Sequence, residues 1–119
     1  MNTYPEQYRH LVSGMKALGE ALPGPMAGFS ALHKAATSSG ALSAKTKELA
    51  ALGMAICLRC KGCIACHVHD ALEAGASQEE ILEIIGVAIL MGGGPSMVYG
   101  IEAYEALNQF EEATVAIAA

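Results

Sequence analysis

The sequence predicts an all-α fold of about five to six helices, in a single domain that spans residues 1–119. Three observations support this prediction. Apolar residues recur at helical spacing along most of the chain, clusters of Gly, Pro and Ser separate these stretches, and no segment alternates apolar and polar residues as a half-buried strand does. The sequence contains no internal repeat or low-complexity linker, and 119 residues suffice for one hydrophobic core.

The first two helices are predicted from apolar spacing and from the breakers that follow them. Pro5 suits the first turn of a helix whose apolar positions continue to Leu22, and Pro23-Gly-Pro25 is expected to end it. The second helix is predicted from about Met26 to Thr37. It ends at Ser38-Ser-Gly40.

The next two helices are predicted to meet at a short break. Residues Ala44 to Leu58 are nearly all good helix formers and follow Ser43, a suitable N-cap. Arg59 to Gly62 interrupts this pattern, and a new helix is expected to open around Cys60 to Cys63. That helix runs to about Ala74, since Gly75 is a typical helix stop.

The last two helices are predicted from a capping box and a glycine run. Ser77-Gln-Glu-Glu80 reads as a capping box that opens the fifth helix. Residues 81–90 are so apolar that we expect this helix to be buried on most sides, in the core or between subunits. Gly92 to Gly94 ends it, and Pro95 suits the first turn of a last helix that continues to about Glu112.

Four cysteines fall at one regular interval, and His67 follows the last of them directly: Cys57, Cys60, Cys63 and Cys66. Cys-x-x-Cys spacing is typical both of metal or iron–sulfur sites and of redox dithiols. Each residue of a helix turns about 100°, so the first and last cysteines, nine residues apart, would point to opposite sides. A four-cysteine cluster therefore requires a loop, and the helix-forming sequence around these residues argues against one.

A redox dithiol fits the predicted helix better. Cys60 and Cys63 would lie in a first helical turn, where free N–H groups and the helix dipole favour a thiolate. Residues three apart in such a turn have Cα atoms about 5 to 5.5 Å apart, a separation that a disulfide tolerates. His67 falls on the same stripe of the helix as both cysteines.

The remaining polar residues of this region are assigned to less specific roles. Cys57 is interpreted as a small buried apolar residue, and Cys66 and His69 are expected to face packing or solvent rather than the stripe. A zinc site made of Cys60, Cys63, His67 and a carboxylate is the alternative use of the same stripe.

A longer pattern resembles a known active-site signature. The pattern consists of Glu48, eleven residues, Cys60-Lys-Gly-Cys63, three residues and His67. It is similar to the active-site signature of the alkylhydroperoxidase D (AhpD) and carboxymuconolactone decarboxylase superfamily. The segments 71–75, 79–81 and 91–99 resemble the core of its short members. The resemblance covers about Ala41 to Tyr104, over half of the chain.

The resemblance implies an AhpD-like helical domain and a role for each matched residue. Cys63 corresponds to the peroxidatic cysteine and Cys60 to the resolving cysteine, while Glu48 and His67 correspond to a proton relay. From the residues alone Glu48 would be read as a solvated surface charge. Gly62 stands where the best-studied peroxidases often have His, and a disulfide reductase needs only the cysteine pair.

The predicted function is a thiol-dependent peroxidase or disulfide oxidoreductase. It would take a hydroperoxide or disulfide substrate and a thiol or dithiol electron donor, need no cofactor, and assemble by family likeness as a homo-oligomer, a trimer or hexamer. Two alternatives stay open: a carboxymuconolactone decarboxylase-type lyase, which shares the fold, and a non-catalytic metal or iron–sulfur binding module.

Composition and charge limit the partners and the cellular location that can be expected. A net charge of −5 argues against nucleic acid and anionic membranes as partners. The amino terminus shows no targeting pattern, so a cytoplasmic protein is expected, and disulfides in that compartment are usually catalytic or redox-active. The chain is 53% hydrophobic and only 16% charged, which is apolar for so small a body and favours burial of surface between subunits.

Overall fold

The structure is a computed structural model that describes residues 3–118, and the all-α prediction is confirmed. Within that range the chain forms six helices and no strand. They are α1 (Tyr4–Ala21), α2 (Pro23–Thr37), α3 (Ala44–Cys57), α4 (Lys61–Glu73), α5 (Gln78–Gly92) and α6 (Gly94–Ala118).

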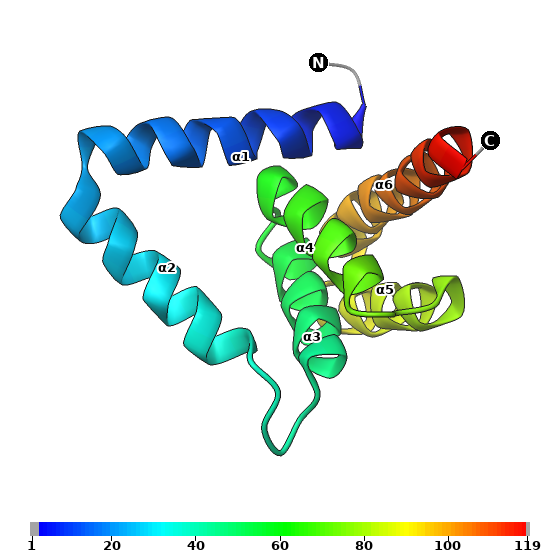
Figure 1. Ribbon diagram of the computed structural model, residues 1–119. Coiled ribbons are helices and arrows are strands. Elements are labelled where there is room, and N and C mark those ends of the chain that lie inside the picture. Colours follow the sequence, from blue (N-terminus) through cyan, green and yellow to red (C-terminus); the bar gives the residue numbers. More distant parts are fainter. Residues whose placement is uncertain (1–2, 119) are drawn as a thin grey trace.

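Helices α3 to α6 pack together as a bundle, and α1 and α2 form a V-shaped arm beside it (Figure 1). We call residues 4–37 the α1–α2 arm. The first half of the arm, α1, packs on α4 and α6, whereas α2 leaves the bundle and approaches it again near its own end, mainly at α3.

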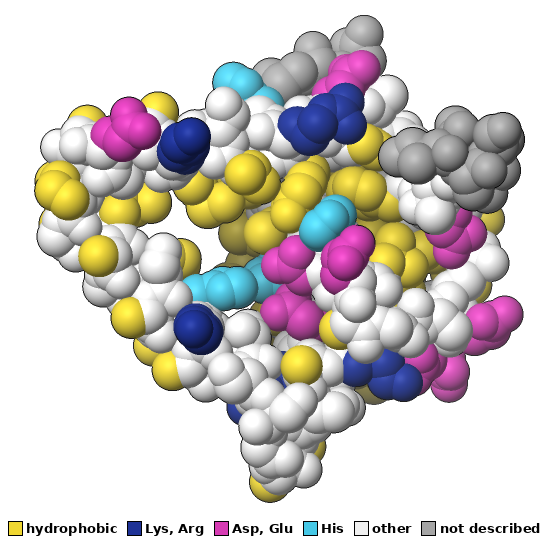
Figure 2. Space-filling model, in the orientation of Figure 1, with side chains coloured by type: hydrophobic (Ala, Val, Ile, Leu, Met, Phe, Trp, Pro, Cys, Tyr) yellow, Lys and Arg dark blue, Asp and Glu magenta, His cyan; other side chains and the backbone are white. Residues whose placement is uncertain are grey.

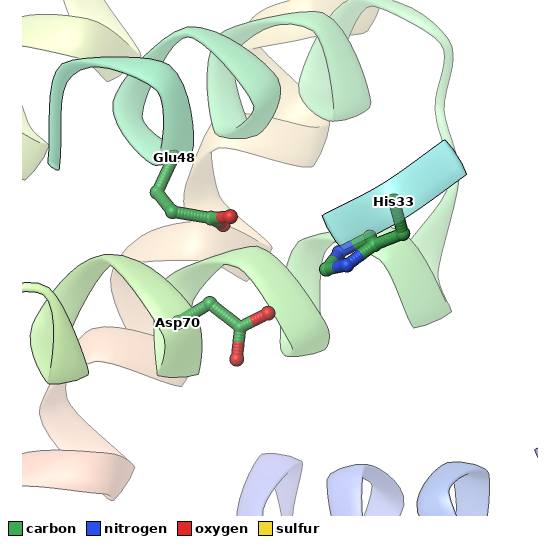
Figure 3. Close-up of side chains that lie close together, drawn as sticks. All are labelled: His33, Glu48 and Asp70. Carbon is green, nitrogen blue, oxygen red and sulfur yellow. The ribbon is translucent and has the colours of Figure 1, made fainter. Parts of the chain in front are cut away.

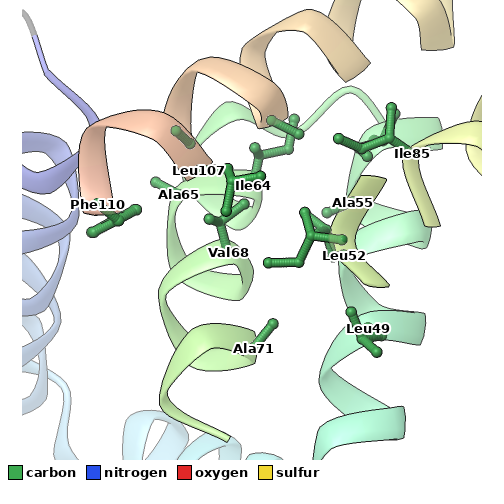
Figure 4. Close-up of a cluster of buried hydrophobic side chains, with 14 of the residues drawn as sticks. Leu49, Leu52, Ala55, Ile64, Ala65, Val68, Ala71, Ile85, Leu107 and Phe110 are labelled. Carbon is green, nitrogen blue, oxygen red and sulfur yellow. The ribbon is translucent and has the colours of Figure 1, made fainter. Parts of the chain in front are cut away.

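The core lies inside the bundle and is made of aliphatic side chains from all four of its helices (Figure 4). The largest fully buried hydrophobic residues are Leu52, Ile56, Ile64, Val68, Ile81 and Leu107. Burying one such side chain contributes about 1.5–3 kcal/mol relative to leaving it in water. The bundle is therefore the rigid part of the fold, and it carries α3 and α4, which hold most of the predicted site residues.

The start of the arm follows the sequence prediction, but the boundary between its helices does not. Thr3 caps α1 in a capping box with Glu6, and Pro5 lies in the first turn as expected. Helix α2 begins at Pro23 and not near Met26, because a proline is well suited to a first helical turn, where its missing N–H costs nothing. The Pro-Gly-Pro segment therefore starts a helix, and only Leu22 separates it from α1.

The corner between α3 and α4 is a Schellman motif. The N–H of Arg59 donates to the carbonyl of Ile56 at 3.1 Å, and the N–H of Cys60 donates to the carbonyl of Ala55 at 3.1 Å. Arg59 has φ of 58°, the left-handed region that this motif requires. The motif ends α3 and reverses the chain direction, and it places Cys60 at the N-cap of α4.

The last two helices agree with the sequence in their caps and differ in their burial and length. The predicted capping box of Ser77 and Glu80 opens α5. The expectation that α5 is buried on most sides is wrong for the chain alone, since Leu90 is 80% exposed and Met91 75% exposed. Helix α6 continues beyond the predicted end near Glu112 to Ala118. In the part of the chain that the structure describes, no helix is both long and apolar enough to cross a membrane.

Candidate active site

A cleft of about 520 Å³ lies between the α1–α2 arm and α4. In Figure 2 the surface is open between the arm and the bundle, with histidine and acidic side chains beside the opening. The arm contributes mostly apolar side chains to the lining, and the α4 segment contributes mostly sulfur-containing and polar ones. The lining residues are Tyr8, Leu11, Met15, Phe29, Ser30 and His33 from the arm, and Cys60, Gly62, Cys63, Cys66, His67 and Asp70 from the α4 segment. All three residues of the predicted stripe on α4 therefore reach one cleft.

Cys60 and Cys63 form a disulfide at the start of α4. Their Cα atoms are 5.2 Å apart, within the separation expected for a first helical turn. The sulfur of Cys60 also accepts a hydrogen bond from the backbone N–H of Cys63 at 3.3 Å, so Cys60 acts as the side-chain cap of the helix. After reduction, the same N–H groups and the helix dipole would stabilise a thiolate at this position.

Glu48 and His67 lie against each other at the edge of the cleft. His67 Nδ1 is 2.9 Å from Glu48 Oε2, although the two residues are 19 positions apart in the chain. Glu48 is only 5% exposed, so it is not the solvated surface charge that its local sequence suggests. An ionised carboxylate only accepts hydrogen bonds, so in that state His67 carries its proton on Nδ1 and leaves Nε2 free to take another.

Cys66 lies in the cleft, and its assignment to packing or solvent is wrong. Its thiol is 3.7 Å from Asp70 Oδ2 and donates to that carboxylate. Burial and the neighbouring charge of Asp70 raise the pKa of Cys66 to about 12. Cys66 is therefore a third sulfur of the cleft that remains protonated at neutral pH, in contrast to the pair at the helix start.

The two other residues left outside the stripe lie away from the cleft. His69 stacks on Tyr8 with ring centroids 3.9 Å apart. Cys57 is exposed and not buried, which corrects the sequence interpretation, and its sulfur lies 3.5 Å from the carbonyl oxygen of Ala88 and 3.7 Å from Ser96 Oγ. The four cysteines therefore do not converge, and this geometry gives no support to a four-cysteine metal or iron–sulfur module.

Two polar residues of the cleft were missed by the sequence analysis. Asp70 lies seven residues after Cys63 and three after His67, so helical spacing alone could have placed it on the same face. His33 comes from α2, and its ring stacks near that of His67 with centroids 6.4 Å apart. No local signal distinguishes His33, because only the return of α2 toward the bundle brings it to the cleft.

Comparison with known proteins shows a similarity that covers most of the chain and not only the candidate site. Residues 23–116 match the sequence model of the Carboxymuconolactone decarboxylase family. An uncharacterized protein of Cupriavidus necator is 40% identical over 95 residues, which are 77% of this chain and 84% of that protein. An uncharacterized protein of the cox locus of Paracoccus denitrificans is 36% identical over 85 residues, 71% of this chain and 77% of that protein.

Two solved structures share the arrangement of helices. A carboxymuconolactone decarboxylase family protein from Legionella pneumophila, crystallised in its apo form, superimposes with a TM-score of 0.86 at 40% identity and covers 90% of this chain and 96% of its own. A family protein from Thermotoga maritima, whose description raises a role in the antioxidative response, gives a TM-score of 0.77 at 32% identity over 85% of this chain and 89% of its own.

Proposed function

Because the chain belongs to the carboxymuconolactone decarboxylase family, we propose that it is a thiol-dependent oxidoreductase of that family, a peroxidase or disulfide reductase that cycles Cys60 and Cys63 between dithiol and disulfide. The observation that carries the proposal is the Cys60–Cys63 disulfide, which lines an open cleft beside the Glu48–His67 pair. The description of the Thermotoga maritima relative points in the same direction.

In the peroxidase reaction, the thiolate of Cys63 attacks the terminal oxygen of a hydroperoxide. The O–O bond breaks, an alcohol leaves, and Cys63 becomes a sulfenic acid. The thiolate of Cys60 then attacks that sulfur, releases water and closes the disulfide. A thiol or dithiol donor must return two electrons to complete the cycle.

In the disulfide reductase reaction, the same pair attacks a substrate disulfide through a mixed disulfide and releases two thiols. Glu48 and His67 have one task in both reactions. His67 accepts a proton at Nε2 when a thiol is activated, and Glu48 stabilises the imidazolium that forms. A lyase of the same fold has no use for the dithiol, so nothing specific in this cleft favours that alternative.

The proposal includes the expected setting of the enzyme. A homo-oligomer, a trimer or hexamer, would cover apolar surface that the single chain exposes. A cytoplasmic location would supply the thiol donor, since glutathione and thioredoxin systems keep that compartment reducing.

The test counts thiols in reduced protein before and after one equivalent of an organic hydroperoxide, with a small organic disulfide in a parallel arm. We expect the loss of two thiols, mapped by mass spectrometry to a Cys60–Cys63 bond, while Cys57 and Cys66 stay free. Cys63→Ser should abolish turnover, whereas Cys60→Ser should leave a trapped sulfenic acid or mixed disulfide on Cys63. Cys57→Ser is the matched control and should behave as wild type.

Two results would contradict the proposal. A bond mapped to Cys57 and Cys66 would show that the wrong pair had been chosen. An unchanged thiol count with both oxidants would exclude dithiol chemistry in this cleft.

A further inference from the structure

Three side chains with metal-binding atoms converge at the cleft from three different helices. His33 comes from α2, Glu48 from α3 and Asp70 from α4, and they point toward one another (Figure 3). One ligand atom of each residue lies within 4.8 Å of the other two. None of the three residues is a cysteine and two of them lie outside α4, so this cluster is distinct from the disulfide although it borders the same cleft.

No Lys or Arg stands beside either carboxylate of this cluster. Among the described residues, the ion-pair partner of Glu48 is His67 and that of Asp70 is His69. Two carboxylates therefore share this small region with an imidazole as the nearest basic group of each. Glu48 is buried, where a charge is costly unless it is paired. A divalent cation held between the two carboxylates would offset this cost.

Both carboxylates are held in the way that metal ligands usually are. His67 Nδ1 lies 2.9 Å from Glu48 Oε2, and His69 Nδ1 lies 2.9 Å from Asp70 Oδ1. The other oxygen of Asp70, Oδ2, also accepts a hydrogen bond from the Cys66 thiol. Such hydrogen bonds fix the orientation of a carboxylate, and each oxygen, which has two lone pairs, keeps one for an ion. Outer partners of this kind are typical of metal sites.

We propose that His33, Glu48 and Asp70 form a binding site for a divalent transition-metal ion of the zinc class. One imidazole nitrogen and two carboxylate oxygens are a donor set that Zn²⁺ accepts, with water in the fourth position of a tetrahedron. Bonds of about 2.0–2.1 Å place tetrahedral donors about 3.3 Å apart, so the present separation of up to 4.8 Å must close by about 1.5 Å. His33 is exposed and lies on the helix with no buried residue, so α2 can make most of this adjustment.

The bound ion would connect elements that otherwise have few contacts. Helix α2 approaches the bundle mainly at α3, and its His33 ring lies beside that of His67 on α4. The ion would bond α2 directly to both α3 and α4. Because the ion binds the folded chain and not the unfolded one, it should raise the melting temperature in a concentration-dependent way.

The test uses chelator-treated protein in the oxidised form, so that the sulfurs of Cys60 and Cys63 are unavailable as ligands. Zn²⁺ is titrated calorimetrically, and we expect one ion per chain together with a higher melting temperature. His33→Ala and Asp70→Asn each remove or weaken a direct ligand, so each should weaken binding by more than the about 10- to 100-fold that follows the loss of an outer partner of a ligand. His10→Ala, an exposed histidine of α1, is the matched control and should bind as wild type.

Co²⁺ provides a readout that does not depend on folding of the variants. Ligation by nitrogen and oxygen gives visible absorption without the near-ultraviolet charge-transfer band of a cobalt–thiolate bond. That band in oxidised protein would overturn the proposal, because it would place the ion on Cys57 or Cys66. Zn²⁺ binding that His33→Ala leaves unchanged, or a dissociation constant weaker than about 1 mM in wild type, would overturn it as well.

Discussion

At the scale of single residues, burial and Asp70 together limit the reactivity of Cys66. Burial, followed by the charge and hydrogen bond of Asp70 and the charge of Glu48, raises the pKa of that thiol to about 12, so the thiolate fraction at pH 8 is very small. Cys66 therefore stays protonated and unreactive, in contrast to Cys60 and Cys63 in the same cleft. This difference would confine thiol–disulfide exchange to the pair at the start of α4.

Asp70→Asn should make Cys66 more reactive, because it removes the charge of Asp70 and leaves burial and the charge of Glu48 to raise the pKa of the thiol. We expect the rate of Cys66 alkylation at pH 8 to rise by about 10-fold for each pKa unit recovered. The measurement is mass-resolved alkylation with iodoacetamide, in which the exposed Cys57 serves as an internal control. Equal Cys66 rates in both proteins would show that Asp70 does not protect this thiol.

Glu48 and His67 make a second prediction at this scale. If they carry the proton during thiol activation, Glu48→Gln and His67→Ala should each slow the reaction by roughly 10²- to 10⁴-fold, the usual contribution of positioned acid–base groups. Loss of either should also raise the pKa of Cys63 toward about 8.5, the value of an unassisted cysteine.

The pH dependence of Cys63 alkylation in reduced protein measures this effect directly. Glu83→Gln removes an exposed carboxylate of α5 and is the control for a general change in charge. Profiles that overlay for wild type and both relay variants, with a midpoint near about 8.5, would mean that the pair is structural and not part of a relay.

At the scale of elements, the same helix-ending motif occurs twice with different residues at its left-handed position. Gly75 follows α4 with φ of 96°, and its neighbours repeat the hydrogen bonds seen after α3. Arg59 occupies the equivalent position after α3 with φ of 58°. A side chain in this conformation costs roughly 1–2 kcal/mol, a cost that glycine avoids.

Exchanging the residue types should therefore shift stability in opposite directions. Arg59→Gly should stabilise the protein by about 0.5–1 kcal/mol, and Gly75→Ala should destabilise it by about 1–2 kcal/mol. Urea denaturation followed by circular dichroism measures both. A destabilising Arg59→Gly would indicate that the arginine side chain makes a contribution larger than the strain of its backbone.

The helices that the sequence predicted best are those with explicit capping residues. Ser43 and Ser77 mark the starts of α3 and α5, and Gly75 follows the end of α4, because each satisfies backbone groups locally. Pro23-Gly-Pro25 was misjudged because proline both stops one helix and suits the first turn of the next. The end of α6 has no cap signal, and the prediction stopped too early.

The predictable part of the site is the part that lies on one helix. The stripe of Cys60, Cys63 and His67 followed from spacing alone, and Asp70 was within reach of the same reasoning. Glu48 was identified only through the family signature, and His33 not at all, because both depend on how α2 and α3 pack against α4. Tertiary packing also determined the surroundings of Cys66.

At the scale of the whole molecule, large apolar side chains remain on the surface of a single chain. They lie on the arm and on both of the last helices, for example Phe29 at 60%, Leu90 at 80% and Ile101 at 50% exposure. Soluble monomers rarely expose extended apolar patches. These faces are the natural candidates for contacts between subunits.

We expect light scattering at micromolar concentration to give a mass several times the 12.3 kDa of the chain, matching a trimer or hexamer. Leu90→Glu should lower that mass, because it places a charge in an apolar contact. Glu83→Gln on the same helix should leave it unchanged. A well-behaved monomer in wild type would exclude stable self-association through these faces.

The shortness of the Cys60–Cys63 link has a consequence for the thermodynamics of the redox cycle. A crosslink stabilises a fold mainly by reducing the entropy of the denatured chain, and this effect grows with the length of the loop that it closes. Here the sequence separation is only three, so the bond contributes about 2 kcal/mol by this relation, against about 3 kcal/mol for a loop of 15 residues. The backbone hydrogen bonds of the corner after α3 do not involve either sulfur. Oxidation and reduction should therefore change the free energy of unfolding less than a crosslink between distant parts of the chain would.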